Sequence, residues 1–317
     1  MSHSSPVIFH GLDGFPFSPN HYLTLGAFDG LHLGHRQIVD QVVTAARSNH
    51  GESVLITFDP HPQEVIQKGP DPFFLLSTLP EKIQVLKHTG LDKILVLPFT
   101  RDFSELPPEA FIKNILVGRV GMRKIWIGYD HGFGRDRSGG IDLLKQLGPE
   151  CGFTVEQVGA HEVGSVVVSS TKIREAIRHG QVELATEMLG YPYTVSGIVS
   201  RGEGIGRKIG FPTANIFVEH PRKLIPHGGV YHVELLIGTD WHRGVCNIGQ
   251  RPTFDGQELR IEVHLLQFQS DIYGMPVCLR FHRRLREEKK FPSVDELIRQ
   301  ITKDVEEANI FWNGSGW

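Results

Sequence analysis

Cysteine is scarce in this 317-residue sequence, which contains only three. They are odd in number and isolated from one another, so we expect reduced thiols in a cytoplasmic protein and not a secreted disulfide scaffold. The first twenty residues contain no basic segment followed by an apolar core, and we therefore expect no signal peptide.

Long apolar runs and runs of one charge are missing as well. No apolar run is long enough to span a membrane, so we expect no membrane partner. No segment is rich in Lys and Arg, and the net charge of -3 argues against a nucleic-acid partner. Hydrophobic residues make up 40% and charged residues 22% of the chain, which is typical of a soluble globular protein, and the length favours two domains.

The sequence does contain a glycine-rich turn at residues 25–36. It follows a short apolar run that predicts a buried strand, and the residues after it are spaced for one helix face: Ile38, Val39, Val42, Val43 and Ala46. Gly26 and Gly34 let the backbone approach a ligand, and the free N–H groups at the helix start suit phosphate. His32 and His35, three residues apart, are predicted to face that ligand and to stabilise its charge.

The two histidines have two other possible roles. Zinc binding lacks a third ligand at a fitting spacing and a His-Glu-x-x-His pattern. Capping and packing alone are compatible with polar residues at any helix start. The phosphate interpretation is favoured, and His-x-Gly-His after a strand resembles the signature of the nucleotidyltransferase superfamily.

Strands and helices alternate over residues 53–128. Short apolar runs predict buried strands at 54–58, 93–97 and 124–127, and helical periods predict helices at 81–88 and 108–116. This alternation predicts a parallel sheet that binds ligands at the carboxyl ends of its strands.

Two further loops are expected at that edge, and a helix start follows them. Residues 57–62 contain two prolines that fix the chain where it leaves the second strand. Residues 128–140 contain Asp130 among five glycines, although a solvated turn would have the same composition. Ser170, Thr171 and Arg174 open a helix, where hydroxyls and a cation favour an anion site for a triphosphate; an N-cap would explain only one hydroxyl.

A second domain is predicted from residue 190, where period-two alternation replaces helical periods. Strands are expected at 193–200, 229–236, 243–248, 260–267 and 276–285, which suggests a small closed barrel. A last amphipathic helix, with a capping box at Ser293 and Glu296, is expected to pack on it in a structural role. The predicted division is an extension at 1–20, a first domain at 21–189 and a second at 190–317.

Residues 201–215 contain the chemistry of the second domain. The glycines and a cation suit a phosphate-binding loop: Gly202, Gly206, Arg207 and Gly210. Thr213 and Asn215 offer hard oxygen ligands for magnesium. This is not a Walker A loop, and a glycine-rich hairpin is the plain alternative. Glu262 lies in an apolar strand, where a carboxylate needs a partner or a function, so it is the candidate general base.

An ordered set of motifs resembles one family from about Leu23 to Glu307, the prokaryotic bifunctional riboflavin kinase/FAD synthetase. The set consists of Gly-Ala-Phe-Asp-Gly-Leu-His-Leu-Gly-His, Phe-Asp-Pro-His-Pro, Ser-Ser-Thr-Lys-Ile-Arg, Gly-Phe-Pro-Thr-Ala-Asn, Asn-Ile-Gly-Gln-Arg-Pro-Thr-Phe, Glu-Val-His-Leu-Leu, Asp-Ile-Tyr-Gly and Leu-Arg-Glu-Glu-Lys-Lys-Phe. Each motif is weak alone, whereas their joint order is highly specific. Departures from the family pattern are Ala27, His131 and Gln267.

The resemblance implies a Rossmann-like nucleotidyltransferase domain followed by a riboflavin kinase barrel. Glu262 would be the base that lets riboflavin attack ATP to give FMN, with Mg2+ held by Thr213 and Asn215. FMN would then attack a second ATP, giving FAD and pyrophosphate, with His32 and His35 stabilising charge and not acting as bases. Further substrate-binding positions implied by the motifs are Phe28, Asp29, Pro212 and Arg286.

Other functions stay open at this point. One is a monofunctional riboflavin kinase with a degenerate first domain, or an adenylyltransferase acting on another phosphorylated substrate. Another is a non-catalytic flavin- or nucleotide-binding regulator, although a mere binder needs neither Glu262 nor magnesium ligands. Small-molecule substrates are the expected partners, and the chain is expected to be a monomer or a weak homo-oligomer.

Overall fold

The computed structural model describes residues 5–67, 72–129, 132–135, 138–202, 204–253 and 256–314, and of residues 251–253 and 256–258 the backbone alone. The chain divides into two compact units, Met1–Ser170 and Thr171–Trp317. The sequence predicted the division later in the chain, between residues 189 and 190. The second unit starts earlier than this because it includes helix α8 (Val182–Leu189), which packs on the barrel strands.

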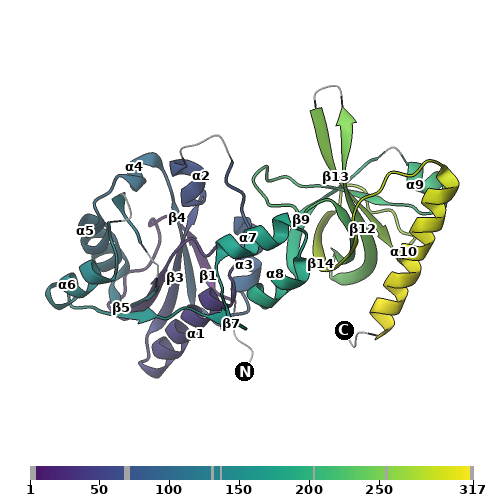
Figure 1. Ribbon diagram of the computed structural model, residues 1–317. Helices are drawn as coiled ribbons and strands as arrows, with labels where there is room; N and C mark the ends of the chain where they lie inside the picture. Colours follow the sequence, from purple (N-terminus) through teal and green to yellow (C-terminus); the bar gives the residue numbers. More distant parts are fainter. Residues whose placement is uncertain are drawn as a thin grey trace. The chain divides into compact units, whose positions relative to one another are not determined.

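Within the described part of the first unit, six parallel strands form one sheet in the order β1-β4-β3-β2-β5-β6 (Figure 1). The strands are β1 (Val7–His10), β2 (His21–Leu25), β3 (Glu52–Asp59), β4 (Lys93–Pro98), β5 (Met122–Gly128) and β6 (Thr154–Val158). The four predicted apolar runs are confirmed as β2 to β5. The edge strands β1 and β6 were not predicted, because most of their residues are exposed or half-buried and form no apolar run.

Helices cover both faces of this sheet. Helices α1 (Leu33–Ser48) and α3 (Leu79–Leu86) pack on one face, and the π-helix η1 (Phe111–Val120) and α6 (Ile141–Cys151) pack on the other. The five residues predicted for the buried face of α1 are the five that are buried in it. The remaining short elements are α2 (Pro62–Ile66), α4 (Arg101–Ser104), α5 (Pro108–Ala110), β7 (Glu162–Val163) and β8 (Val166–Val167).

The strand order reverses at β2, which has β3 on one side and β5 on the other. Open α/β sheets bind ligands outside the carboxyl ends of their strands at such a reversal. The histidine turn leaves the sheet directly after β2, so the topology places it at this ligand-binding edge.

Within the described part of the second unit, six antiparallel strands close into a barrel in the order β10-β13-β12-β11-β14-β9. The strands are β9 (Tyr193–Ser200), β10 (Ala214–Phe217), β11 (Gly229–Ile237), β12 (Asp240–Thr253), β13 (Gly256–Leu265) and β14 (Pro276–Arg286). The five predicted strands are confirmed. Strand β10 was missed, because its residues were assigned to the loop that contains Thr213 and Asn215.

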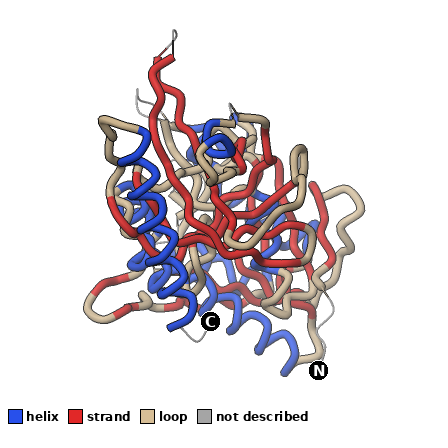
Figure 2. Tube along the Cα trace, turned by 90° about the vertical axis from the view of Figure 1, so that its right-hand side faces the viewer, coloured by secondary structure: helices blue, strands red, loops and turns tan. Residues whose placement is uncertain are grey.

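The helices of this unit are α7 (Ser170–Arg178), α8, α9 (Ile205–Lys208) and α10 (Val294–Gly314). Figure 2 shows α10 lying along the barrel strands. Its start agrees with the predicted cap, because the backbone N–H of Glu296 donates to Ser293 Oγ at 3.3 Å. Among the described residues, no helix has the length and apolar character needed to cross a bilayer.

Candidate active sites

The histidine turn of the first unit is a compact structure at the start of α1. His32 is the N-cap residue, and its Nδ1 accepts the backbone N–H of His35 at 3.3 Å. A neutral imidazole that accepts at Nδ1 carries its proton on Nε2, which makes Nε2 a donor suited to a phosphate oxygen. The two rings are stacked, with centroids 3.6 Å apart and planes 16° apart, so the predicted pair is brought together.

Phe28 and the glycines shape the space around the two rings. Phe28 has a left-handed φ of 49°, and its ring packs edge-on against His35 with centroids 5.1 Å apart. A Cβ on Gly26 would lie 3.3 Å from the Phe28 ring, and one on Gly34 would lie 3.4 Å from the His32 ring. A side chain at position 26 would therefore crowd the Phe28 ring, whereas one at position 34 would reach ordinary contact with the His32 ring.

Asp29 and Ser170, both predicted to bind substrate, hold the turn itself. The buried Asp29 carboxylate accepts the backbone N–H groups of Leu76 and Ser77, each at 3.0 Å, and Ser170 Oγ donates to the Asp29 carbonyl at 2.9 Å. The Gly30 N–H in turn donates to Ser77 Oγ at 3.0 Å. These contacts, made between segments far apart in sequence, fix the turn before any ligand is present.

The other predicted residues of this half lie elsewhere or are not described. Thr171 and Arg174 are on the first turn of α7, at the start of the second compact unit; Thr171 is exposed and Arg174 half-buried. Asp130 lies outside the described residues, as does the departure at His131. Sequence reasoning did not single out His61, which caps α2 and stacks on Phe73 with centroids 4.6 Å apart.

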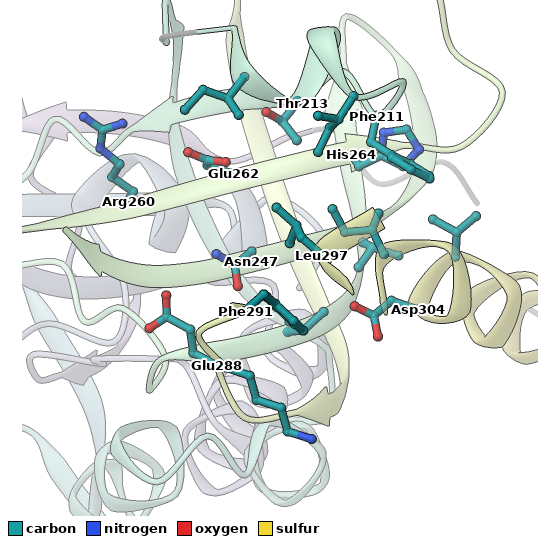
Figure 3. A pocket seen from close by; sticks show the side chains of 18 of the residues that line it. Phe211, Thr213, Asn247, Arg260, Glu262, His264, Glu288, Phe291, Leu297 and Asp304 are labelled. Carbon is teal, nitrogen blue, oxygen red and sulfur yellow. The ribbon is translucent and has the colours of Figure 1, made fainter. Parts of the chain in front are cut away.

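The second unit contains a cavity of about 390 Å³ that brings together most residues predicted for the barrel (Figure 3). Polar groups and apolar groups both line it. The polar lining comprises Thr213, Asn215, Asn247, Arg260, Glu262, His264, Arg286, Glu288, Lys289 and Asp304. Apolar side chains of α9, the turn after it, the segment between β14 and α10, and α10 itself also line it, among them Ile205, Phe211, Phe291, Leu297 and Ile301. A cavity with these two kinds of lining suits a ligand with a flat apolar part and a polar chain.

Glu262 occupies the centre of a polar row across three adjacent strands. In the strand pairing it stands opposite Asn215 of β10 and opposite Asn247 of β12. Directly opposed residues of antiparallel strands present their side chains on the same face, so the carboxylate has an amide on either side. In Figure 3 the Glu262 carboxylate points toward Thr213, the residue before β10.

The glycine loop lies against the two predicted magnesium ligands. A Cβ on Gly202 would lie 2.2 Å from Asn215 Nδ2, and one on Gly206 would lie 2.3 Å from the Phe211 carbonyl oxygen and 3.3 Å from Thr213 Oγ1. A larger residue at position 202 would displace the Asn215 side chain, and one at position 206 would clash with the Phe211 backbone. Gly210, at the end of the loop, has a left-handed φ of 88°. Arg207 is exposed on α9, a single helical turn within the loop.

His264 fixes the turn that precedes Thr213. Its Nδ1–H donates to the carbonyl oxygen of Pro212 at 2.9 Å, and its ring meets that of Phe211 edge-on. His264 follows Glu262 by two residues on β13, so both side chains are on the same face of the strand. Strand β13 therefore supplies both the candidate base and a support for the turn.

Arg286 lines the cavity with its guanidinium already paired to α10. Its Nε donates to Asp304 Oδ1 at 3.0 Å and its Nη2 to Asp304 Oδ2 at 2.6 Å. Gln300 Nε2 also donates to Asp304, at 2.8 Å. The C-terminal helix, expected only to pack on the barrel, thus forms one wall of the cavity, and Arg286 attaches it. A helical apolar stripe in the sequence gives no sign of this second use.

Magnesium can be tested against the donor set of this cavity. Among the residues that the structure describes, no three His, Cys, Asp or Glu side chains gather as metal ligands. Thr213 and Asn215 instead provide a hydroxyl and an amide carbonyl on the lining of the cavity, and Glu262, the candidate base, lines it as well. Hard oxygen donors that leave positions for water and phosphate are what Mg2+ requires, so the donor set fits this ion.

Comparison with family models divides the chain in two. Residues 16–172 match the FAD synthetase family and residues 189–312 match the riboflavin kinase family. The histidine turn lies in the first match and the barrel cavity in the second. The segment between the two matches contains most of α7 and α8.

Curated relatives match nearly the whole chain. Proteins named bifunctional riboflavin kinase/FMN adenylyltransferase are 38% identical in Listeria monocytogenes, over 92% of this chain and 93% of that protein, and 37% identical in Escherichia coli, over 92% of each. A crystal structure described as a macrolide-efflux protein from Streptococcus pneumoniae has a TM-score of 0.84 at 31% identity and covers 96% of this chain and 99% of that one. Efflux is said of that protein, and its likeness to this chain concerns the fold.

Proposed function

The chain belongs to the bifunctional riboflavin kinase/FMN adenylyltransferase family, and we propose that the two reactions take place at the two sites described above. It phosphorylates riboflavin to FMN with ATP, and it transfers the adenylyl group of a second ATP to FMN, which gives FAD and pyrophosphate. The barrel cavity is assigned to the first reaction and the histidine turn to the second.

In the barrel, Glu262 is the proposed general base. It takes the proton of the ribityl 5′-hydroxyl as that oxygen attacks the γ-phosphorus of ATP, the bond to the β,γ-bridging oxygen breaks, and ADP leaves. The amides of Asn215 and Asn247 flank the carboxylate in the strand register. The apolar lining from α10 suits the flavin ring, and the polar row suits the ribityl chain.

The phosphates of this ATP are assigned to the loop from Gly202 to Gly210, which lies against Thr213 and Asn215. These two residues would hold Mg2+, which neutralises phosphate charge when it is bound. The Pro212 carbonyl, held by His264, sets the position of the Thr213 turn. Arg286 is assigned to the cavity wall, where it keeps α10 in place through Asp304.

In the first unit, a phosphate oxygen of FMN attacks the α-phosphorus of ATP, and the bond to the α,β-bridging oxygen breaks. The attacking group is already an anion, so this step requires no base. His32 and His35 are proposed to donate to the phosphates, and Nε2 of His32 is the donor that its cap hydrogen bond specifies. Gly26, Phe28 and Gly34 shape the site, Asp29 and Ser170 hold it, and Thr171, Arg174 and Asp130 stay predicted nucleotide contacts.

One observation carries the kinase assignment: Glu262 stands in register with two amides, inside a cavity bordered by a glycine loop. The test is a chromatographic assay of the purified chain with riboflavin, ATP and MgCl2. FMN should appear first and FAD afterwards. FMN without FAD would refute the assignment of the first unit, the absence of both would refute the proposed function, and turnover unchanged by EDTA would refute the role of Mg2+.

We further propose that the chain acts in the cytoplasm on small molecules, as a monomer or a weak homo-oligomer, with no nucleic-acid or membrane partner. The three free cysteines and the balanced charge of the sequence support this proposal. Size-exclusion chromatography with light scattering tests the oligomeric part.

A further inference from the structure

Lys82 of α3 is almost completely buried, with 4% of its surface exposed, although no motif in the sequence includes it. A buried ammonium is costly unless its donors are used. Its Nζ donates to the carbonyl oxygen of Ala27 at 2.5 Å and to Thr57 Oγ1 at 3.2 Å. Thr57 Oγ1 also donates to the Ala27 carbonyl at 3.2 Å, so the three groups form one closed set.

The three groups lie at the carboxyl ends of two neighbouring strands. Ala27 lies two residues after the end of β2, and Thr57 lies near the carboxyl end of β3. The ammonium therefore stands at the edge of the sheet where both ligand-binding loops begin. Asp29, Asp59 and Glu64 surround it with carboxylates that raise its pKa, whereas its burial lowers the pKa by more.

The turn that begins at Ala27 contains backbone strain. Phe28 has a φ of 49° and Leu31 a φ of 35°, in the region that L-residues rarely adopt. Each such residue costs on the order of 1–3 kcal/mol and persists only where its surroundings fix it. Asp29 and Gly30 are fixed by Leu76 and Ser77, and Ala27 is fixed by Lys82. Lys82 is thus the side chain that holds the entry to the strained turn, five residues before His32.

We propose that Lys82 is a positioning residue for adenylyl transfer: it fixes Ala27 and Thr57 so that the strained turn presents His32 and His35 to the phosphates. This rests on the proposed function of the first unit. The ammonium has a second effect, because it supplies the counter-charge of three carboxylates whose negative field would otherwise repel FMN and ATP.

The test uses Lys82→Met, which keeps the length of the side chain but has neither charge nor donor, and Lys82→Arg, which keeps both. Lys87→Met is the matched control, since Lys87 stands at the end of the same helix and its Nζ donates to Oε1 of the exposed Gln84 at 3.5 Å. Each protein is assayed for FAD formation from FMN and ATP, and riboflavin phosphorylation serves as an internal control in the other unit.

Lys82→Met should lower kcat for FAD formation at least tenfold, because a small displacement of catalytic groups is costly, and leave riboflavin phosphorylation within twofold. Its unfolding temperature should fall, because the substitution leaves three carboxylates without their counter-charge and the Ala27 carbonyl without the ammonium donor, so kcat is compared at a temperature where circular dichroism shows every variant folded. Lys82→Arg should recover most of the loss, and Lys87→Met should change nothing. A loss of kcat in the Met variant that the Arg variant recovers would show that the charge and donors of Lys82 position the turn, because a side chain that only fills space would not require them.

FAD formation by Lys82→Met within twofold of wild type would overturn the proposal. So would equal losses in the Met and Arg variants, because the charge and donors would then be irrelevant. A wild-type protein that makes FMN but no FAD would instead refute the proposed function of the first unit, so the two failures are distinguishable.

Discussion

His232 on β11 provides a prediction for the pH dependence of the barrel unit. Its side chain is buried beneath α10, where its ring lies 4.6 Å from that of Phe311. Neither ring nitrogen has a hydrogen-bond partner among the described residues. Burial and the neighbouring Arg283 and His282 lower its pKa, Asp304 opposes them, and the pKa falls from 6.5 to about 4.

The sign of the effect follows from this lowered pKa. Between pH 6.5 and 4 the unfolded chain binds a proton at His232 that the folded chain excludes, so stability falls as the pH falls through this window. Integrated from pH 7.5 to pH 5, the difference amounts to about 2 kcal/mol, out of a limit near 3 kcal/mol at lower pH. His282 adds to the same trend, because burial lowers its pKa also, although Glu234 at 2.9 Å opposes the shift.

The assay is chemical unfolding of the full chain, followed through riboflavin kinase activity and tryptophan fluorescence, at pH 7.5 and pH 5. His232→Gln stays polar but cannot take a proton, so its loss of unfolding free energy between the two pH values should be about 2 kcal/mol smaller than that of wild type. His179→Gln, at an exposed position in the same unit, should behave like wild type. The same pH dependence in wild type and His232→Gln would refute the reasoning.

Three further predictions concern the two sites. Glu262→Gln should abolish FMN formation but leave FAD synthesis from added FMN, and normal FMN formation would exclude Glu262 as the base. His32→Ala should slow FMN-to-FAD conversion by roughly a hundredfold while sparing phosphorylation, and equal loss of both activities would contradict the assignment. Asp304→Ala leaves Arg286 without its carboxylate, so it should cost about 3 kcal/mol in urea unfolding and raise KM for riboflavin; an unchanged KM would mean that α10 does not form the flavin wall.

The sequence predicted the structure best where the spacing of apolar residues determines which face of a helix or strand is buried. The apolar spacing after the histidine turn predicted the five buried residues of α1, because burial of a helix face follows its period. Alternation predicted five of the barrel strands for the same reason. Strand β10 escaped because its four residues adjoin a motif, and β1 because an edge strand of four residues has no apolar run.

Contacts between segments distant in sequence could not be predicted in this way. Lys82 follows Glu81 in a helix, a pattern typical of a solvated surface, yet the fold buries it against Ala27 and Thr57. The apolar stripe of α10 predicted packing but not what it packs on, and the pairing of Arg286 with Asp304 spans two elements. Such roles depend on tertiary neighbours, which periodicity does not specify.

The catalytic groups proposed for the two sites differ because their nucleophiles differ in protonation state. A ribityl hydroxyl must lose its proton in order to attack, and the barrel provides a carboxylate that stands in register with two amides. The phosphate of FMN is already an anion, so a base in the first unit would add only repulsion. That unit provides stacked histidines at a helix start, over a turn whose own carboxylate, Asp29, is bound by backbone amides. The roles proposed for Glu262 in one site and for His32 in the other follow from the protonation state of the attacking group.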